Sequence, residues 1–283
     1  MTTFNNQKNL IVTIILLFAF VTNNATAGAK ELIQQIKQKA EFMAKKPRIV
    51  FLITRDTNNY EAHKTVPLFA ELLKKEHGYK VTVLLGKGDH GSYRYPSMKA
   101  LSRADLLVVF ARRIALPHDQ MNAIKSYLSK GKPLIGIRTA NHAFAVQGKV
   151  GDVADGFEDW PEFVAGILGC ENRGYGPHEL GYDVTLVPEE ASHPIVKDLQ
   201  IKQWHSKGGI YKVAPLLDKE ATVLLKGKVN DSDSVEPIAW TRNAGKSRVF
   251  YISLGYPDDF QTPQFISLLT NGIKWALDKK SAQ

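Results

Sequence analysis

Four short apolar runs in the first half of the chain constrain its fold most. They occupy residues 48–54, 80–85, 105–111 and 133–137. None alternates polar with apolar residues, and short continuous apolar runs are typical of strands buried on both faces of a parallel sheet. Two helical patterns lie between them, with apolar stripes around Phe69 and Ile124. This order predicts a three-layer, doubly wound α/β fold with a mostly parallel sheet and right-handed crossovers.

The second half of the chain continues the pattern after a loop-rich stretch. We expect further strands over residues 182–187, 222–226, 236–241 and 248–254. A helix closes the chain, with Thr262 as a good N-cap and Pro263 as a good first helical residue. Because no linker or repeat interrupts the pattern, we predict one α/β domain over residues 48–280, with insertions between its two halves.

The first 27 residues have the features of an export signal. They carry one cation, Lys8, and no acid, and residues 10–21 form a largely apolar run. That run is too short to span a bilayer, which takes about 20 residues. Small residues, Ala25 and Ala27, stand at positions −3 and −1 of a cleavage after residue 27. We therefore predict a signal peptide over residues 1–27 and a periplasmic or extracellular protein. An uncleaved membrane anchor is the alternative, and an amphipathic helix is expected over residues 28–47.

Composition excludes several classes of protein. With one cysteine, Cys170, the chain forms no intramolecular disulfide and no Cys-x-x-Cys redox pair. The net charge of +9 comes from 37 Lys and Arg against 28 Asp and Glu, and the cations are scattered rather than clustered. We find no nucleic-acid-binding motif and expect no nucleic-acid partner. A homo-oligomer remains open.

Polar residues directly follow the predicted strands, and this is the strongest functional signal. In open parallel sheets, ligands collect beyond the carboxyl ends of the strands. The candidate residues there are Arg55 and Glu61 after the first strand, Arg113 after the third, Arg138, Asn141 and His142 after the fourth, and Tyr256 and Asp259 after the last.

The turn after the fourth strand argues against acyl-enzyme chemistry. A nucleophile elbow needs Ser or Cys at the centre of a Gly-x-Nuc-x-Gly turn. The matching turn, residues 136–140, has Arg138 at its centre, and a protonated guanidinium cannot attack a carbonyl. We expect Arg138 to pair with Glu61 or Asp56, since a charge after a buried strand needs a partner. Cys170 is expected to be a small buried apolar residue.

The sequence gives little support for a cofactor. The glycine-rich segment 86–91 lacks the spacing of a phosphate loop and is interpreted as a loop without a nucleotide. Eight histidines are present, but no His-x-His or His-Glu-x-x-His pattern places two of them together. His193 and His205 are candidate ligands for a divalent metal if the fold brings them to a carboxylate. No metal is assigned from the sequence.

Several motifs, taken in order, resemble the ThuA-like (trehalose-utilisation) family over residues 48–278. They are Tyr60-Glu61, Gly131-Lys132-Pro133, residues 136–144, His193-Pro194-Ile195, residues 237–242 and Leu254-Gly255. The resemblance implies a flavodoxin-like or amidotransferase-like fold without the cysteine nucleophile. It also implies a role in sugar breakdown, with a small carbohydrate as substrate. The family has Gly-His where this chain has Gly255-Tyr256, so that histidine is missing here.

Three functions are compatible with these residues. The first is acid/base chemistry on a sugar or keto-sugar, either isomerisation or elimination. In it His142 is the general acid/base, Arg138 and Arg113 stabilise an enediolate-like oxyanion, and Glu61 is a second base or orients His142. Arg55, Asn141, Tyr256 and Asp259 would bind substrate. The alternatives are a non-catalytic carbohydrate- or partner-binding module and a metal-dependent hydrolase.

Overall fold

The structure is a computed structural model that describes residues 28–36, 46–177, 179–229, 232 and 234–278. The chain divides into two units, residues 1–46 and 47–283. In the first unit, residues 28–36 form a helix, within the segment predicted to be an amphipathic helix. The predicted signal peptide, residues 1–27, lies outside the described residues. Among the described helices, none is both long and apolar enough to cross a membrane.

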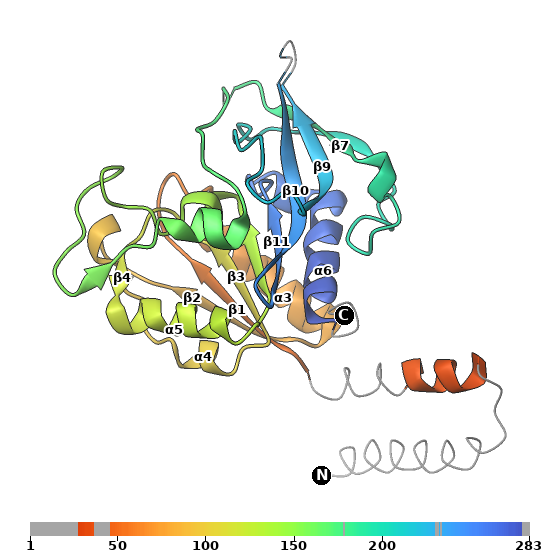
Figure 1. Cartoon of the computed structure of the whole chain (residues 1–283), viewed down its shortest axis with the longest axis horizontal. Coiled ribbons are helices and arrows are strands. Elements are labelled where there is room, and N and C mark those ends of the chain that lie inside the picture. Colours follow the sequence, from red (N-terminus) through yellow and green to blue (C-terminus); the bar gives the residue numbers. More distant parts are fainter. Residues whose placement is uncertain (1–27, 37–45, 178, 230–231, 233, 279–283) are drawn as a thin grey trace. The chain divides into compact units, whose positions relative to one another are not determined.

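The second unit is built on a nine-stranded sheet (Figure 1). Its order is β2-β1-β3-β5-β11-β10-β9-β7-β8. The first five of these strands pair in parallel. They are β1 (Arg48–Ile53), β2 (Lys80–Leu85), β3 (Leu106–Phe110), β5 (Leu134–Ile137) and β11 (Ser247–Ile252). The carboxyl ends of β1, β3, β5 and β11 therefore meet at one edge of the sheet.

The remaining four strands extend the sheet in antiparallel order. They are β10 (Val235–Ala244), β9 (Thr222–Lys228), β7 (Tyr182–Leu186) and β8 (Gln203–Ser206). A separate two-stranded pairing joins β4 (Leu116–Pro117) and β6 (Phe157–Glu158). The sequence patterns predicted β7, β9, β10 and β11 but not β8, a four-residue strand in which one side chain is buried and two are exposed.

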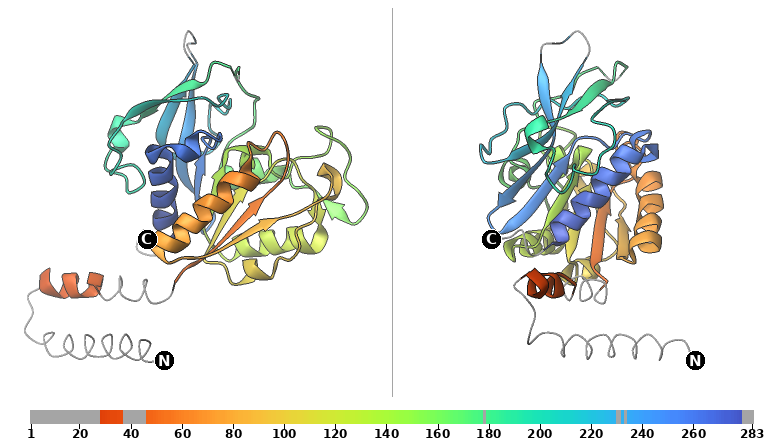
Figure 2. Two further views of the ribbon diagram at one scale, coloured as in Figure 1. Left: turned by 180° about the vertical axis from the view of Figure 1, so that it is seen from behind. Right: turned by 90° about the vertical axis from the view of Figure 1, so that its right-hand side faces the viewer.

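Helices cover both faces of the sheet, so the predicted three-layer α/β fold is confirmed (Figure 2). On one face lie α3 (Ala62–His77) and α6 (Pro263–Leu277). On the other lie α4 (Lys99–Ser102) and α5 (His118–Ser129). Successive residues of β1 serve the two layers: Phe51 packs edge-on against Phe69 of α3, while Val50 and Leu52 join the core cluster that contains Met121 of α5. As predicted, Thr262 caps α6 by accepting a hydrogen bond from the Phe265 amide.

The expectation of two buried faces holds for β1, β3 and β5 but is wrong for β2. Strand β2 lies at the sheet edge. Its residues are exposed or half-buried, except for Leu84, which is buried. An edge strand packs on one neighbour, so part of its surface remains in water. The run 80–85 starts with Lys80 and contains Thr82, a pattern that fits this position.

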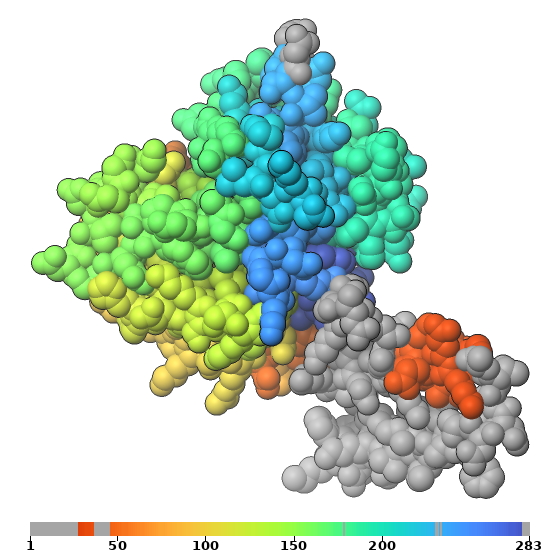
Figure 3. Space-filling view, in the orientation of Figure 1, coloured from red at the N-terminus to blue at the C-terminus, as the bar shows by residue number. Residues whose placement is uncertain are grey.

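The insertion between the two halves packs across the antiparallel strands. It includes a short π-helix, Val164–Leu168, within the segment predicted to be helical. The Trp240 indole donates a hydrogen bond to the Leu168 carbonyl at 2.8 Å, and Arg242 donates to the Ile167 carbonyl at 2.7 Å. Figure 3 shows these green and blue segments side by side on one face. Shorter 3-10 turns occur at His90–Ser92, Arg138–His142, Pro188–Glu190 and Asp259–Gln261.

Candidate functional site

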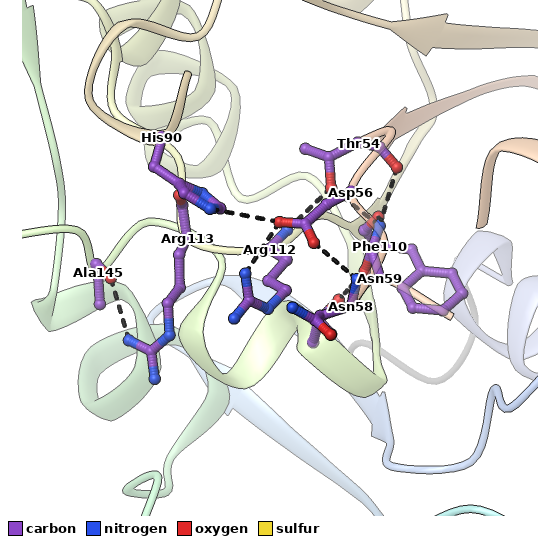
Figure 4. Close-up of polar contacts among 10 residues, drawn as sticks. Thr54, Asp56, Asn58, Asn59, His90, Phe110, Arg112, Arg113 and Ala145 are labelled. Carbon is purple, nitrogen blue, oxygen red and sulfur yellow. Dashed lines mark hydrogen bonds and ion pairs between the residues drawn. The ribbon is translucent and has the colours of Figure 1, made fainter. Parts of the chain in front are cut away.

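A fully buried amide, Asn59, joins the loops that follow three parallel strands. Its Nδ2 lies 2.9 Å from Thr54 Oγ1 and 2.9 Å from the Phe110 carbonyl, at the ends of β1 and β3 (Figure 4). Its Oδ1 accepts a hydrogen bond from Thr139 Oγ1, in the turn after β5, at 2.5 Å. Buried polar groups require partners, so Asn59 holds the three loops together. Sequence reasoning missed it, because nothing in the sequence distinguishes it from its exposed neighbour Asn58.

Arg138 points into the interior rather than into a cleft. Its backbone is left-handed, with φ 44°, and its side chain is fully buried. The guanidinium donates to the carbonyls of Ser253 at 2.8 Å and Gly209 at 3.0 Å. It lies 4.0 Å from the centre of the Tyr60 ring and 4.8 Å from that of Tyr211. These contacts lock the guanidinium between two aromatic rings.

The expected partners of Arg138 are therefore wrong. Asp56 pairs with Arg112 at 2.9 Å, and Glu61 pairs with Lys64 at 2.6 Å. Carbonyl oxygens and ring faces replace a carboxylate around Arg138, because the left-handed turn directs its side chain away from both acids. A group with no exposed surface cannot contact substrate in this structure. In this structure Arg138 contacts two carbonyls and two ring faces, so it holds the surrounding loops together.

His142 is buried and is held by two side-chain amides. Its Nδ1 lies 2.5 Å from Asn141 Oδ1 and 2.8 Å from Asn172 Nδ2. Asn172 Oδ1 accepts the Gly174 amide at 3.0 Å, so its nitrogen is the atom that faces the ring. Nδ1 thus faces an acceptor, Asn141 Oδ1, and a donor, Asn172 Nδ2, and it hydrogen-bonds to one of them at a time. With a proton, Nδ1 donates to Asn141 and the lone pair is on Nε2; without one, Nδ1 accepts from Asn172. Nε2 has no hydrogen-bond partner among the described residues. Asn141, predicted to bind substrate, orients His142 instead.

Burial and nearby cations keep the His142 ring neutral. The side chain is 7% exposed. Burial lowers its pKa well below the ordinary value, and the charges of Arg113, Arg112 and Arg138 lower the pKa further. At neutral pH the ring is therefore a neutral imidazole with a basic nitrogen, surrounded by positive charge.

Arg113 links His142 to the loop after β3. Its amide donates to the His142 carbonyl at 3.2 Å, and its Nη1 donates to the Ala145 carbonyl at 3.2 Å. The residue is half-buried, with a left-handed φ of 45°. Non-glycine residues in this region carry strain and are concentrated at functional sites. Arg113 and His142 therefore lie next to each other through their backbones.

A polar pocket lies next to this group, at the ends of β1 and β3. It has a volume of about 310 Å³ and is lined by residues 54–58 and 88–90, Tyr93, Arg112 and Ile114; we call it the β1–β3 pocket. The Asp56–Arg112 ion pair lies on its wall (Figure 4). His90 Nε2 lies 3.5 Å from Asp56 Oδ2, and His90 Nδ1 donates to the Arg113 carbonyl at 2.7 Å.

Arg55, a candidate site residue from the sequence, lies on the wall of this pocket. His90 and Arg112 also line it but were not among the candidate residues. The sequence feature that could have indicated His90 is the Asp89-His90 pair inside the glycine-rich segment 86–91, because both side chains are titratable. Contact with the end of β3 brings that loop to Asp56, and this long-range contact leaves no local pattern.

The other predicted site residues have different roles. Glu61 is exposed, begins α3 and contacts Lys64, so Asn141 and Asn172 rather than Glu61 orient His142. Asp259 is buried: one oxygen accepts the amides of Gly255 and Tyr256 at 2.8 and 2.9 Å, and the other accepts from Ser206 at 2.9 Å. Burial raises the pKa of Asp259. Through these contacts it shapes the loop after β11.

Tyr256 lies beside Tyr60, with ring centres 6.0 Å apart. It is half-buried and follows the carboxyl end of β11, the edge of the sheet at which the sequence places it. Tyr60 also lies over the Arg138 guanidinium, so Tyr256 contacts, at a tilt, the ring that packs on Arg138.

The structure does not assemble the suggested metal ligands. His193 Nδ1 accepts the Ile195 amide at 3.2 Å, and His205 Nδ1 lies 2.9 Å from Asp183 on the edge strands. In the described part of the chain, no group of three or more His, Cys, Asp or Glu side chains is placed to bind a metal ion. Cys170 is buried in an apolar cluster, and burial raises the pKa of its thiol to about 12.

These features define the class of protein: a three-layer α/β domain with its polar groups at the carboxyl ends of parallel strands. The family model for ThuA, described as trehalose utilisation, matches residues 49–276. The chain therefore belongs to the ThuA family, and the resemblance seen in its motifs is confirmed.

Two crystal structures of ThuA-like proteins are similar to the chain. The protein from Bacteroides uniformis has a TM-score of 0.62 and 16% identity, covering 83% of this chain and 94% of that one. The protein from Parabacteroides merdae has a TM-score of 0.61 and 19% identity, covering 83% of this chain and 91% of that one. At these identities the similarity shows the fold alone. No curated protein matches the chain.

Proposed function

We propose that this chain is an enzyme of carbohydrate breakdown that moves protons on a sugar or keto-sugar, with His142 as the acid/base group. One observation carries the proposal: His142 has one ring nitrogen fixed by two amides and the other available, inside a ring of guanidinium charge. A general base must be unprotonated at working pH and held in one tautomer. Burial and the nearby guanidinium charges support the first condition. The tautomer that this proposal requires is the one in which Nδ1 donates to Asn141 Oδ1.

The surrounding charge favours a reaction that develops negative charge. In the proposed step, Nε2 takes a proton from the carbon next to a keto group, and the electron pair of that C–H bond moves onto the carbonyl oxygen to give an enediolate. Positive groups placed where this charge develops stabilise it. Arg113 is half-buried, and among the charged side chains it lowers the pKa of His142 most.

Two outcomes complete the reaction without an external reactant. In isomerisation, the hydroxyl proton on the neighbouring carbon's oxygen transfers to the enediolate oxygen, the neighbouring carbon becomes the new carbonyl, and the Nε2 proton is delivered to the former carbonyl carbon. In elimination, the enediolate electrons reform the carbonyl and a double bond, the bond to the β-oxygen of the glycoside breaks, and Nε2–H protonates that leaving oxygen. Neither route needs a thiol or serine nucleophile, which agrees with an arginine at the centre of the 136–140 turn.

The test is turnover of a 3-keto-glycoside by His142→Gln. Loss of general acid/base catalysis costs on the order of 10²–10⁴-fold in rate, so we expect kcat to fall by at least about 100-fold. The control is His118→Gln, because His118 is a surface histidine with a 60% exposed side chain. Wild-type kcat in His142→Gln would refute the catalytic role.

A second candidate is a non-catalytic carbohydrate-binding module. The polar β1–β3 pocket and the 62% exposed Tyr175 favour it, because aromatic faces pack on sugar rings. This function predicts saturable sugar binding by the wild-type protein and no turnover of any keto-sugar.

Export is proposed together with either function. The segment 1–27 supports it by its apolar run and small residues before the predicted cleavage. Expression of the full chain in a bacterium should give a mature protein that begins at Gly28. A full-length protein retained in the cytoplasm would contradict export.

A further inference from the structure

The His142 ring packs against a buried tyrosine, Tyr211. The two ring centres are 5.8 Å apart, and the ring planes are tilted by 55°. The Arg138 guanidinium lies 4.8 Å from the centre of the same tyrosine ring. Tyr211 is 3% exposed, so its ring contacts protein rather than solvent. One aromatic side chain therefore contacts both the proposed acid/base group and the buried cation at the start of the same turn.

Tyr211 and Asn172 reach His142 from one two-stranded ribbon. Residues 173–176 pair with residues 210–212 through backbone hydrogen bonds of 2.8–2.9 Å, and we call this pairing the Tyr211 ribbon. Asn172 directly precedes it, and its Nδ2 lies 2.8 Å from His142 Nδ1. The amide and the ring that contact His142 thus belong to one backbone unit, although 39 positions separate them in the sequence.

Arg138 holds the Tyr211 ribbon against the turn that carries His142. Its Nη2 donates to the Gly209 carbonyl at 3.0 Å, just before the ribbon. A Cβ on Gly208 would lie 2.8 Å from the same nitrogen, so glycine at this position permits the close approach. The guanidinium therefore fixes the distance between the Tyr211 ring and the His142 ring.

Arg138 forms no ion pair in the described part of the chain. Its guanidinium contacts two carbonyl oxygens and two ring faces. Asp259 interacts with this charge at longer range, but its oxygens accept from Ser206 and from two backbone amides. An aromatic face attracts a cation without carrying a net charge. The tyrosine rings therefore keep Arg138 in the interior as an unpaired cation.

The groups that act on the His142 ring come from three elements. Arg112 and Arg113 lie in the loop after β3, Arg138 lies in the same turn, and Tyr211 lies in the ribbon. Burial lowers the pKa of His142 most, and the three arginines lower it further. Burial raises the pKa of Tyr211, so that its phenol stays neutral. Loss of the Tyr211 ring would admit water to the imidazole and weaken the effect of burial.

We propose that Tyr211 is a positioning residue: its ring fixes the orientation of His142 and keeps the imidazole next to the unpaired charge of Arg138. The inference rests on the proposed function, in which His142 accepts a proton from carbon. Tyr211 acts through His142 and touches no substrate. Without the ring, the imidazole gains room to rotate, and a misplaced catalytic group loses rate.

The test compares two buried tyrosines with similar contacts. Tyr127, like Tyr211, is 3% exposed, has a cation over its ring and donates one hydroxyl hydrogen bond. Its hydroxyl bonds to the Pro133 carbonyl at the amino end of β5, whereas His142 follows the carboxyl end of that strand. Tyr211→Leu and Tyr127→Leu therefore both remove a buried ring, but only the first removes one beside His142. Tyr211→Phe keeps the ring and removes the hydroxyl bond to Tyr60.

The first readout is the protonation of His142, followed by nitrogen NMR of the full chain with labelled histidine. His142→Gln assigns the signal. In the wild type and in Tyr127→Leu, the imidazole should stay neutral at pH 5.5. In Tyr211→Leu the midpoint of protonation should rise by at least about half a pH unit, because burial opposes the charged form less. In the wild type, a cross-peak should also connect the ring protons of His142 and Tyr211.

The second readout is turnover of a 3-keto-glycoside. Misplacement of a catalytic group by about 1 Å costs up to about 100-fold, so kcat of Tyr211→Leu should fall at least about 10-fold while KM stays within about threefold. The acid limb of its pH profile should move to higher pH together with the NMR midpoint. Tyr211→Phe should recover most of the lost kcat, and Tyr127→Leu should keep the pH profile of the wild type.

Three results would overturn the inference: no cross-peak between the two rings in the wild type, equal His142 midpoints in Tyr211→Leu and Tyr127→Leu, or a raised KM with unchanged kcat in Tyr211→Leu. The cross-peak needs no variant, so it decides even if Tyr211→Leu does not fold. Urea titration shows which variants are folded.

The positioning role and the catalytic proposal fail separately, because the NMR midpoint does not depend on turnover. If His142→Gln keeps turnover while Tyr211→Leu raises the midpoint, Tyr211 positions the imidazole and the catalytic role of His142 falls. If His142→Gln loses turnover while the two leucine variants titrate alike, the role of His142 stands and that of Tyr211 falls.

Discussion

Thr139 donates a hydrogen bond of 2.5 Å to Asn59, and this contact ties the turn after β5 to the loop after β1. The same amide reaches the Phe110 carbonyl at the end of β3. The position of His142, three residues after Thr139, therefore depends on a buried residue with no chemical role.

Asn59→Ala should destabilise the fold. It leaves a buried hydroxyl and two buried carbonyl groups without their partner, so we expect a loss of about 2–4 kcal/mol in the free energy of unfolding. Urea titration of the variant against the wild type measures it. Asn58→Ala, at an exposed neighbour, should change the value by less than about 0.5 kcal/mol. Equal stability of the two variants would show that Asn59 does not join the loops.

Arg138→Lys should lower stability even though the charge is kept. A lysine ammonium is a point charge that cannot reach both carbonyls or stack as a plane between Tyr60 and Tyr211. We expect a loss of about 2–3 kcal/mol, because hydrogen bonds from charged groups contribute about 1.5–3 kcal/mol each. Thermal unfolding tests this, with Arg103→Lys at an exposed site as the control. An unchanged melting temperature would contradict the interior placement of Arg138.

The neutral state of His142 makes stability depend on pH. Its pKa in the folded protein is lowered, as are those of His77 and His193. Below about pH 6.5, the ordinary value, the unfolded chain binds protons that the folded chain does not. The free energy of unfolding should therefore be at its full value above pH 6.5 and fall as pH decreases, by at most about 1.4 kcal/mol per pH unit for each such histidine.

His142→Gln isolates the contribution of one histidine to that slope. Urea titrations at pH 7.5 and 5.5 should show a smaller decrease in the variant than in the wild type. His118→Gln, at an exposed position, serves as the control. An identical decrease in wild type and His142→Gln would mean that His142 is protonated in the folded protein.

Glu61→Gln should leave turnover within about twofold of wild type. Glu61 contacts Lys64 on the surface, and exposed ion pairs contribute about 0–1 kcal/mol. Steady-state kinetics on the keto-glycoside that reports His142 activity measures this. A loss of 100-fold would restore Glu61 to the catalytic group.

Local sequence patterns were sufficient for the parallel core of the fold. Strands β1, β3 and β5 are short apolar runs, and the Thr262-Pro263 start of α6 has a local cause in capping. Strand β8 was missed because only one of its four side chains is buried and its pairing with β7 is long-range.

The candidate site was harder to predict because side-chain direction is not local. Arg138 follows a buried strand, as a site residue would, but its left-handed φ turns it inward between Tyr60 and Tyr211. The Asp56–Arg112 pair forms where β1 and β3 lie side by side, and no sequence spacing indicates it. The sequence could predict which residues lie at the carboxyl edge of the parallel strands. The direction and the partner of each side chain required the structure.

The central claim is that Nε2 of His142 removes a proton from carbon, and hydrogen exchange tests it most directly. A 3-keto-glycoside is incubated with enzyme in deuterium oxide, and deuterium at the carbons next to the keto group is followed by NMR. We predict rapid incorporation with wild type and His118→Gln, and incorporation at the uncatalysed rate with His142→Gln. Equal incorporation with and without the His142 imidazole would contradict the account.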